Sequence, residues 1–337
     1  MSLKETKNKF SIMTDMLIVL IVLSAMSMYY YGKRGIAVIA VTTLTCVVTD
    51  FICCRLRKME YEKDISALIT GLTLSMMLSA SVPYYAAIIA SVFAIVVAKH
   101  AFGGHGCEIF NAAAVGFLFT SLCFPQNMLT YPKAFADIPL DANVSQGLLS
   151  PSFTSSFLVT KSADLSLIDT LIGKFSGPMG TGFVLLMCVA VVFLMLRRSV
   201  SAITFFTELA ILGVYAFFRY DKDPMCVLYF FSSGMLLFGM IFLSCDYSII
   251  PKTRSSRLIY GIVFALCVIF FYDYSTTENA AIYAVILASP IGIELDRKAL
   301  SFADMASKRR GLIHKVNKPL NNITETLDIL DNNEQEK

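Results

Sequence analysis

Long apolar runs separated by short polar segments set the pattern of this chain. Ten runs are long enough, at about 1.5 Å per helical residue, to serve as spans of a bilayer with a roughly 30 Å hydrocarbon core. They cover residues 12–31, 35–54, 65–80, 83–99, 109–124, 181–196, 200–218, 225–245, 258–272 and 278–293. The pattern predicts an all-α polytopic membrane protein with about ten transmembrane helices.

The third run differs from the others because polar residues interrupt it. Ser66, Thr70 and Thr73 lie within 65–80. Polar groups that face lipid lack hydrogen-bond partners, so such a helix is favoured where it packs against protein. We therefore expect the third span to be surrounded by the rest of the chain.

Composition agrees with this class and narrows the possible functions. Of the 337 residues, 56% are hydrophobic and 16% are charged, whereas a soluble domain carries about 25% charged residues. The mean hydropathy is +0.66. These values exclude a disordered chain, a nucleic-acid-binding domain and an ordinary water-soluble enzyme. The expected surroundings are a lipid bilayer, and no nucleic-acid partner is expected.

The positions of Lys and Arg predict the orientation in the membrane. Most of them lie in segments on the side of the N-terminus, such as those around Arg55, Arg197 and Arg254. By the positive-inside rule, this side is the cytoplasm. We expect a multi-pass protein of the bacterial cytoplasmic membrane, with both termini in the cytoplasm and residues 125–180 outside.

Nine Cys residues are scattered along the chain, mostly inside apolar runs. They form no Cys-x-x-Cys pair and no Cys/His cluster at metal-ligand spacing. A free Cys in an apolar run behaves as a small hydrophobic residue. We therefore expect no disulfide framework and no metal site, and no catalytic motif is visible.

Residues 125–180 form the longest predicted non-helical stretch and divide the spans five and five. The predicted parts are a five-span half 1–124, an extracytoplasmic loop 125–180, a second five-span half 181–293 and a cytoplasmic tail 294–337. Long loops inside compact membrane proteins are usually functional.

Weak internal similarity relates the two halves. Residues 69–74 resemble 232–237, and residues 110–114 resemble 278–282. The second pair places an Asn, a typical helix N-cap, before small residues. An odd number of spans per half reverses the second half in the membrane, so the similarity predicts inverted five-helix repeats with a site at their interface.

Residues 99–116 hold the densest group of candidate binding residues. Gly103, Gly104 and Gly106 permit tight backbone conformations and expose amide groups. Asn111 marks the start of a helix. Backbone donors beside a helix N-terminus suit an anion or the polar edge of a ring ligand. An ordinary glycine-rich turn between two spans is the alternative.

The same segment resembles a stretch of the RnfD/NqrB family that reads roughly K-H-x-F-G-G-x-G-x-N-I-F-N-P-A-x-x-G. Further similarities follow in the family's order and cover nearly the whole span region, at residues 64–74, 173–180, 231–235, 244–251 and 289–297. Several ordered similarities are more specific than one glycine motif. The chain is therefore identified as a divergent member of this family.

The resemblance implies a fold and a function. The family's ten-span architecture agrees with the inverted repeats predicted above. Its members are membrane subunits of complexes in which electrons pass between ferredoxin or NADH and an acceptor while Na⁺ or H⁺ is translocated. The implied partners are other membrane and peripheral subunits of a redox complex, and the chain would catalyse little alone.

The resemblance also implies flavin. In the family, a flavin transferase attaches one FMN through its phosphate to a Thr of the outer loop, and a second flavin is bound without a covalent bond. The candidate acceptor hydroxyls here belong to Thr154, Ser155 and Ser156. The residues implied for the noncovalent flavin are Gly103, Gly104, Gly106, Glu108 and Asn111.

Several positions depart from the family. The small residues of its acceptor motif are missing, and Phe153 replaces one of them, so a plain Ser/Thr-rich loop is the alternative to FMN attachment. Glu108 replaces an Asn, and an ionised carboxylate only accepts hydrogen bonds. Glu108 could instead line an ion path or pair with His105 or Lys99.

Other ionisable residues lie near span ends. Asp50, Asp64 and Asp246 are candidate ion-relay residues, because carboxylates in lipid are costly. Capping, or pairing with a nearby Lys, is the simpler interpretation. His100 and His105 could relay protons, but a solvated His at a cytoplasmic turn is ordinary.

Three functions follow from these patterns. The first is a flavin-carrying subunit of an ion-translocating redox complex. The second is a non-redox transporter or channel of the inverted-repeat type, which would be colourless and move a small solute without an electron donor. The third is a flavin-free subunit that docks redox partners.

Overall fold

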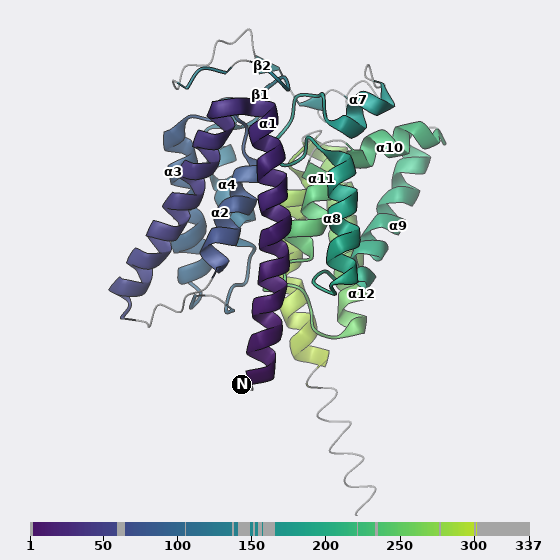
Figure 1. The fold of residues 1–337 in the computed structure, drawn as a ribbon. Helices are drawn as coiled ribbons and strands as arrows, with labels where there is room; N and C mark the ends of the chain where they lie inside the picture. Colours follow the sequence, from purple (N-terminus) through teal and green to yellow (C-terminus); the bar gives the residue numbers. More distant parts are fainter. Residues whose placement is uncertain are drawn as a thin grey trace, which may run out of the picture. The chain divides into compact units, whose positions relative to one another are not determined.

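The computed structural model describes residues 3–58, 65–104, 106–136, 138–140, 149–150, 152–153, 157, 166–220, 222–232, 235–275, 278–299 and 301. The chain divides into one unit of residues Met1–Ile293 and a second of Glu294–Lys337. The first unit is a bundle of helices and contains every candidate site (Figure 1).

The first two predicted spans are the two arms of one long helix, α1 (Leu3–Leu56), which turns back at Gly32 (Figure 1). Gly32 adopts φ 56° and ψ −143°, a conformation that breaks the helix and that favours glycine. Arg34, fully buried just beyond the turn, donates to the carbonyls of Ala80 and Val82. The turn is therefore tied to the end of the next helix.

Three further helical segments complete the first half. They are α2 (Ser66–Met77), α3 (Tyr84–Phe93) continued by the π-helix η1 (Ala94–His100), and α4 (Ala112–Cys123). Gly116 lets α4 approach α3 closely, because a Cβ there would lie 2.5 Å from the Ala90 carbonyl oxygen. Nine of the twelve α2 residues are buried, which confirms that the third span faces protein.

The segment between the halves contains short regular elements, so the prediction that it is non-helical is wrong in part. They are α5 (Pro125–Met128), α7 (Leu167–Ile172) and an antiparallel pair of two-residue strands, β1 (Tyr131–Pro132) and β2 (Leu149–Ser150). Ser166 caps α7 by accepting from Asp169 N at 3.1 Å. The Ser166 hydroxyl and the Lys174 ammonium hold the pKa of Asp169 below its usual range.

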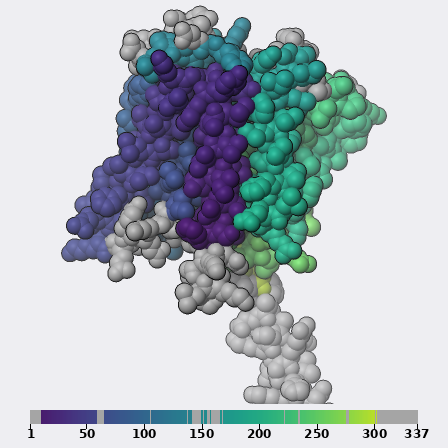
Figure 2. Space-filling model, viewed as in Figure 1, coloured from purple at the N-terminus to yellow at the C-terminus, as the bar shows by residue number. Residues whose placement is uncertain are grey.

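The second half begins with α8 (Val184–Leu196) and α9 (Ala202–Arg219). A bent helical segment follows, formed by α10 (Pro224–Ser232), α11 (Met235–Phe238) and the π-helix η3 (Gly239–Ser244). The helix α12 (Arg254–Ser275) and a helix over residues 280–299 come last. The face of α1 adjoins α8, so the two halves pack against each other (Figure 2).

The outer faces of this bundle are apolar, unlike those of a water-soluble protein. Large apolar side chains such as Ile21, Val192 and Phe206 are exposed on the helices, whereas Asp50, Lys99 and other ionisable groups are buried. Apolar outer faces match lipid, and buried ionisable groups in membrane proteins mark functional centres. The surface therefore agrees with a membrane protein.

Helices occupy each of the ten predicted runs in the described residues. By length and composition, α1, α9 and α12 can cross a membrane, and the pair Pro224–Ser232 and Met235–Ser244, bent by 64°, adds a fourth candidate. Four further apolar helices are shorter than these candidates: Ser66–Met77, Tyr84–His100, Ala112–Cys123 and Val184–Leu196. The count of ten spans, the four-part division and the inverted repeat stay predictions.

Candidate functional site

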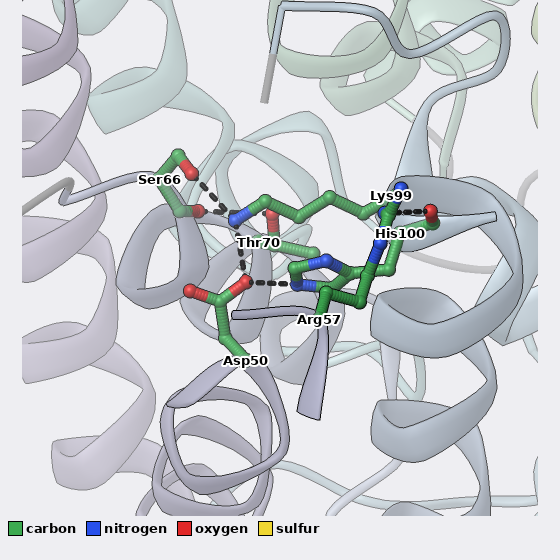
Figure 3. A network of polar contacts seen from close by, with 6 residues as sticks. All are labelled: Asp50, Arg57, Ser66, Thr70, Lys99 and His100. Atoms are coloured by element: carbon green, nitrogen blue, oxygen red, sulfur yellow. Dashed lines mark hydrogen bonds and ion pairs between the residues drawn. The ribbon is translucent and has the colours of Figure 1, made fainter. Parts of the chain in front are cut away.

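A buried network of charged side chains joins the second arm of α1 to η1 and α2 (Figure 3). Asp50 Oδ1 lies 3.0 Å from Lys99 Nζ and 2.8 Å from His100 Nε2. The side chains of Asp50 and Lys99 are 6% and 2% exposed. Lys99 Nζ also donates to Ser66 Oγ at 2.7 Å. These groups are tolerated in the interior because each charge has a partner.

The π-helix η1 directs two consecutive residues toward one carboxylate. Lys99 and His100 end this helix, and both side chains point at Asp50 (Figure 3). Arg57 Nη1 donates to the His100 carbonyl at 2.5 Å. π-Helical segments are rare in proteins, and those that occur are often found at functional sites. The network therefore combines an unusual backbone with paired buried charges.

The structure corrects two expectations about this segment. His100 is not solvated at a turn, because it is 6% exposed and held by Asp50. Lys99 pairs with Asp50 rather than with Glu108. Asp50 and Lys99 are far apart in the sequence, so nothing in the local pattern could have matched them. His105 and Asp64 lie outside the described residues.

Cys54 lies beside the network, and the ligand atoms of Asp50, Cys54 and His100 are within 4.8 Å of one another. The sequence spacing did not predict this juxtaposition. Lys99 Nζ contacts the same carboxylate, and its positive charge opposes a metal cation there. The arrangement therefore favours an ion-paired network over a metal centre.

Ser66 connects the network to a small cavity between the two halves. The cavity has a volume of about 50 Å³ and is lined by α1, α2, the start of α4 and the segment after η3. Its polar lining residues include Ser66, Thr70, Thr73, Glu108, Asn111 and Asp246. Polar side chains that are distant in sequence thus meet at this cavity, next to the network of Asp50 and Lys99.

Asn111 holds this junction with both ends of its amide. Its Oδ1 accepts from Ala114 N at 3.0 Å, which confirms the predicted N-cap of α4. Its Nδ2 donates to Asp246 Oδ2 at 3.0 Å, across the two halves. Asp246 also accepts from Ser248 N at 3.2 Å, as the capping interpretation of this residue predicts.

Two substitutions at Asn111 separate these roles. We expect N111S to keep a capping hydroxyl and lose the Asp246 contact, at about 1.5–3 kcal/mol for a hydrogen bond to a charged group. We expect N111A to cost about 1 kcal/mol more, because it also removes the cap. Unfolding in detergent, followed by circular dichroism, measures both. Equal losses in the two variants would refute a separate capping role.

The glycine-rich turn has the predicted backbone but does not line the cavity. Gly103, Gly104 and Gly106 adopt φ values of 122°, 94° and 91°, which L-residues rarely adopt. Within residues 99–116, the first residue that lines the cavity is Glu108. The structure thus brings Glu108 and Asn111 together with Asp246 and leaves the three glycines in the turn.

A second polar centre lies at the opposite end of the bundle. Tyr131 donates to Glu278 Oε1, and Ser152 also hydrogen-bonds the Glu278 carboxyl. Glu278 is 3% exposed. Asn279 stands at the predicted N-cap position, directly before the helix over residues 280–299, and its backbone carbonyl accepts from Ile282 N at 2.9 Å. Its side chain does not complete the cap, because Oδ1 has no hydrogen-bond partner among the described residues.

The candidate acceptors Thr154, Ser155 and Ser156 lie outside the described residues, but their flanks do not. Phe153 and Phe157 are buried at 9% and 1% exposure and contact a cluster of rings from Phe175, Tyr220 and Tyr229. Phe153 N donates to the Ser176 carbonyl at 2.9 Å. Phe153 therefore packs inward on the second half.

Sequence reasoning missed several buried ionisable residues, among them Glu208. Glu208 lies in α9, is fully buried and accepts from Ser244 Oγ at 2.7 Å. A single carboxyl inside an apolar run is itself a signal of function in a membrane protein. Glu208 lies in the middle of the predicted span 200–218, whereas the candidate aspartates lie near span ends.

Ionisable groups buried between helices with apolar outer faces define a polytopic membrane protein with polar centres in its interior. The order of its glycine, Asn and Asp positions specifies more than this class. The chain belongs to the NQR2, RnfD, RnfE family, whose model matches residues 3–297. This match confirms the resemblance found in the sequence.

Individual relatives are distant but extend over most of the chain. The D-type subunit of the Na⁺-translocating ferredoxin:NAD⁺ oxidoreductase complex of Acetobacterium woodii is 27% identical and covers 82% of this chain and 85% of its own. The D-type subunit of an ion-translocating oxidoreductase complex of Erwinia tasmaniensis is 26% identical, over 84% and 91%. The corresponding protein of the proton-translocating complex of Clostridium ljungdahlii is 27% identical, over 69% and 73%.

Proposed function

We propose that this chain is the D-type membrane subunit of a bacterial complex that couples electron transfer between ferredoxin and NAD(H) to cation translocation. It works in the cytoplasmic membrane beside other membrane and peripheral subunits. The observation that carries the proposal is the family match over residues 3–297, which includes every buried polar centre of the bundle. The names of three relatives agree with this role.

The described residues leave little room for a noncovalent flavin, because the cavity beside Glu108 and Asn111 measures about 50 Å³. Each end of the Asn111 amide already has one hydrogen-bond partner. We therefore derive no step through a flavin at this position.

The proposal places covalent FMN, which would supply one- and two-electron transfer when bound, on the segment of residues 154–156. A flavin transferase would attach the FMN phosphate to one of the three hydroxyls. The flanking Phe153 and Phe157 are buried against the second half, so a group attached between them would be held close to the bundle. This anchoring supports the segment as a carrier.

We expect co-expression with a flavin transferase to add one FMN to the chain. Intact mass and ultraviolet-excited in-gel fluorescence after denaturation detect the addition. Thr154→Ala, Ser155→Ala and Ser156→Ala, made singly and together, locate the acceptor. Thr160→Ala is the matched control, since it removes a hydroxyl from the same segment but not from the proposed site, and it should keep full labelling.

The outcome separates the three functions. Loss of FMN in the triple variant, with Thr160→Ala still labelled, supports the flavin-carrying subunit. A chain that stays unlabelled while a known substrate of the transferase is labelled contradicts FMN attachment. Co-purification of redox subunits with that unlabelled chain would then favour a docking role, and solute movement without an electron donor would favour a transporter.

The relatives leave the cation open. Those of Acetobacterium woodii and Clostridium ljungdahlii are named for sodium and for protons, and both are 27% identical to this chain. The choice between these cations therefore depends on the chemistry of the carboxyl groups in the bundle.

A further inference from the structure

A carboxyl group without a cationic partner lies inside the second half. Glu208 belongs to the inward-facing stripe of α9, together with Thr204, Leu212 and Ala216, and its exposure is 0%. Its Oε1 accepts from Ser244 Oγ, the last residue of η3, at 2.7 Å. Its Oε2 has no hydrogen-bond partner among the described residues.

A second incompletely bonded group comes from the neighbouring helix. Tyr260 of α12 is fully buried, and its hydroxyl makes no well-formed hydrogen bond in the described part of the chain, although the Ser289 side chain lies near it. Gly261 brings α12 against this turn of α9, because a Cβ there would lie 3.2 Å from the Thr204 carbonyl oxygen. Glu208 and Tyr260 are within electrostatic range of each other.

Among the described residues around Glu208, no positively charged group pairs with its carboxylate. Cys245 and Asp246 follow η3, and Tyr260 and Arg257 lie on α12. Arg257 Nε donates to the Pro251 carbonyl at 2.7 Å, and no ion pair to Glu208 occurs in the residues described. An isolated buried carboxylate is so costly that it binds a proton instead.

Asp15 shows how the same bundle treats a carboxylate that stays charged. It is 3% exposed, and its Oδ1 lies 3.0 Å from Arg197 Nη2, while its Oδ2 accepts from Ser199 Oγ at 2.6 Å. Asp50 is similarly paired with Lys99. Glu208 differs from both because it has one hydroxyl partner and no cation among the described residues.

We propose that Glu208 is a proton-binding site in the membrane interior, with the proton on its carboxyl and with the Ser244 hydroxyl as its hydrogen-bond partner. Binding converts the carboxylate to the neutral acid, and release returns it. A hard metal cation takes about six or more oxygen ligands, whereas one hydroxyl of the described residues is within hydrogen-bond distance of this carboxyl. The inference rests on the proposed role in cation movement and assigns one residue to it.

Dicyclohexylcarbodiimide tests this site in the purified full-length chain. The O–H of a protonated carboxyl in apolar surroundings adds across a C=N bond of the reagent to give an O-acylisourea, and migration of its acyl group to nitrogen yields a stable N-acylurea. We expect one adduct on the peptide that contains Glu208, formed more slowly as the pH rises, and none on those of Asp15 and Asp50. Glu208→Gln should abolish that adduct, and thermal unfolding of the variant reports whether it folds.

Two results would overturn the proposal. Absence of the Glu208 adduct from pH 5 to pH 8, with the folded wild-type chain, would show that no protonated carboxyl is present there. Protection by sodium chloride but not by choline chloride at fixed pH would assign the carboxylate to sodium instead. Neither readout involves flavin or electron transfer, so the proposed function can fail while this inference holds, and the converse.

Discussion

Asp50→Asn is expected to lower the free energy of unfolding by about 3–5 kcal/mol, the cost of leaving a buried charge without its partner. The charge in question is the Lys99 ammonium, which is 2% exposed and lies 3.0 Å from Asp50 Oδ1. Lys99 would keep its hydrogen bond to the Ser66 hydroxyl, which carries no charge to replace the carboxylate. The asparagine keeps the size and polarity of the side chain, so the expected loss reports the charge.

The double variant D50N/K99M distinguishes the effect of an unpaired charge from the effect of changing the side chain at position 50. Replacing both charges removes the uncompensated ammonium, and such replacements are often neutral or stabilising. We therefore expect the double variant to recover most of the loss, as measured by thermal unfolding in detergent. Asp169→Asn is the matched control, because this carboxylate is exposed and its ion pair with Lys174 spans 3.5 Å; its effect should be small.

A D50N variant as stable as the wild type would contradict the network as a structural centre. A double variant as unstable as D50N would show that the loss comes from the position rather than from the unpaired charge. The expected order of midpoints is wild type, then the double variant, then D50N.

Gly173→Ala is expected to have the second largest effect. Gly173 ends α7 in the left-handed region, with φ 87°, and an added Cβ would lie 1.2 Å from the carbonyl oxygen of Gly182. The left-handed conformation costs an L-residue roughly 1–2 kcal/mol, and overpacking adds about 1–3 kcal/mol. The atoms that this Cβ would meet belong to the backbone of Gly182, so no side-chain rotation can relieve the contact.

Gly182→Ala provides the matched control on the other side of the same contact. A Cβ at Gly182 would lie 3.9 Å from the Gly173 carbonyl oxygen, an ordinary van der Waals distance. We expect the free energy of unfolding of this variant to lie within about 1 kcal/mol of the wild-type value, as for other tolerated apolar changes. Equal destabilisation of the two variants would show that the clash is relieved by movement of the segment.

The same glycine segment explains how the segment between the halves is attached to the bundle. Gly180 N donates to the Met76 carbonyl at 2.7 Å, and Met179 N donates to the Leu78 carbonyl at 3.0 Å. A Cβ at Gly180 would lie 2.4 Å from Met76 Cβ. Of the family-like glycines at 173, 177 and 180, Gly180 therefore serves a close contact with α2, whereas Gly173 lies against Gly182 of its own segment.

Local features of the sequence predicted local features of the structure. The apolar runs marked where helices form, because burial of their side chains in lipid or protein favours the helix whatever it contacts. Asn111 predicted the start of α4, since its cap bonds a backbone group three residues away. The positive φ values of Gly103, Gly104 and Gly106 followed from the absence of a side chain.

Tertiary structure alone decided which polar groups meet. Asp50 and Lys99 form a pair only because α1 and η1 pack side by side, and Asn111 reaches Asp246 only because the two halves are in contact. Glu208 became a candidate when its described surroundings proved to lack a cation. Partners distant in the chain leave no periodic signal, because the energy that joins them arises after the helices have packed.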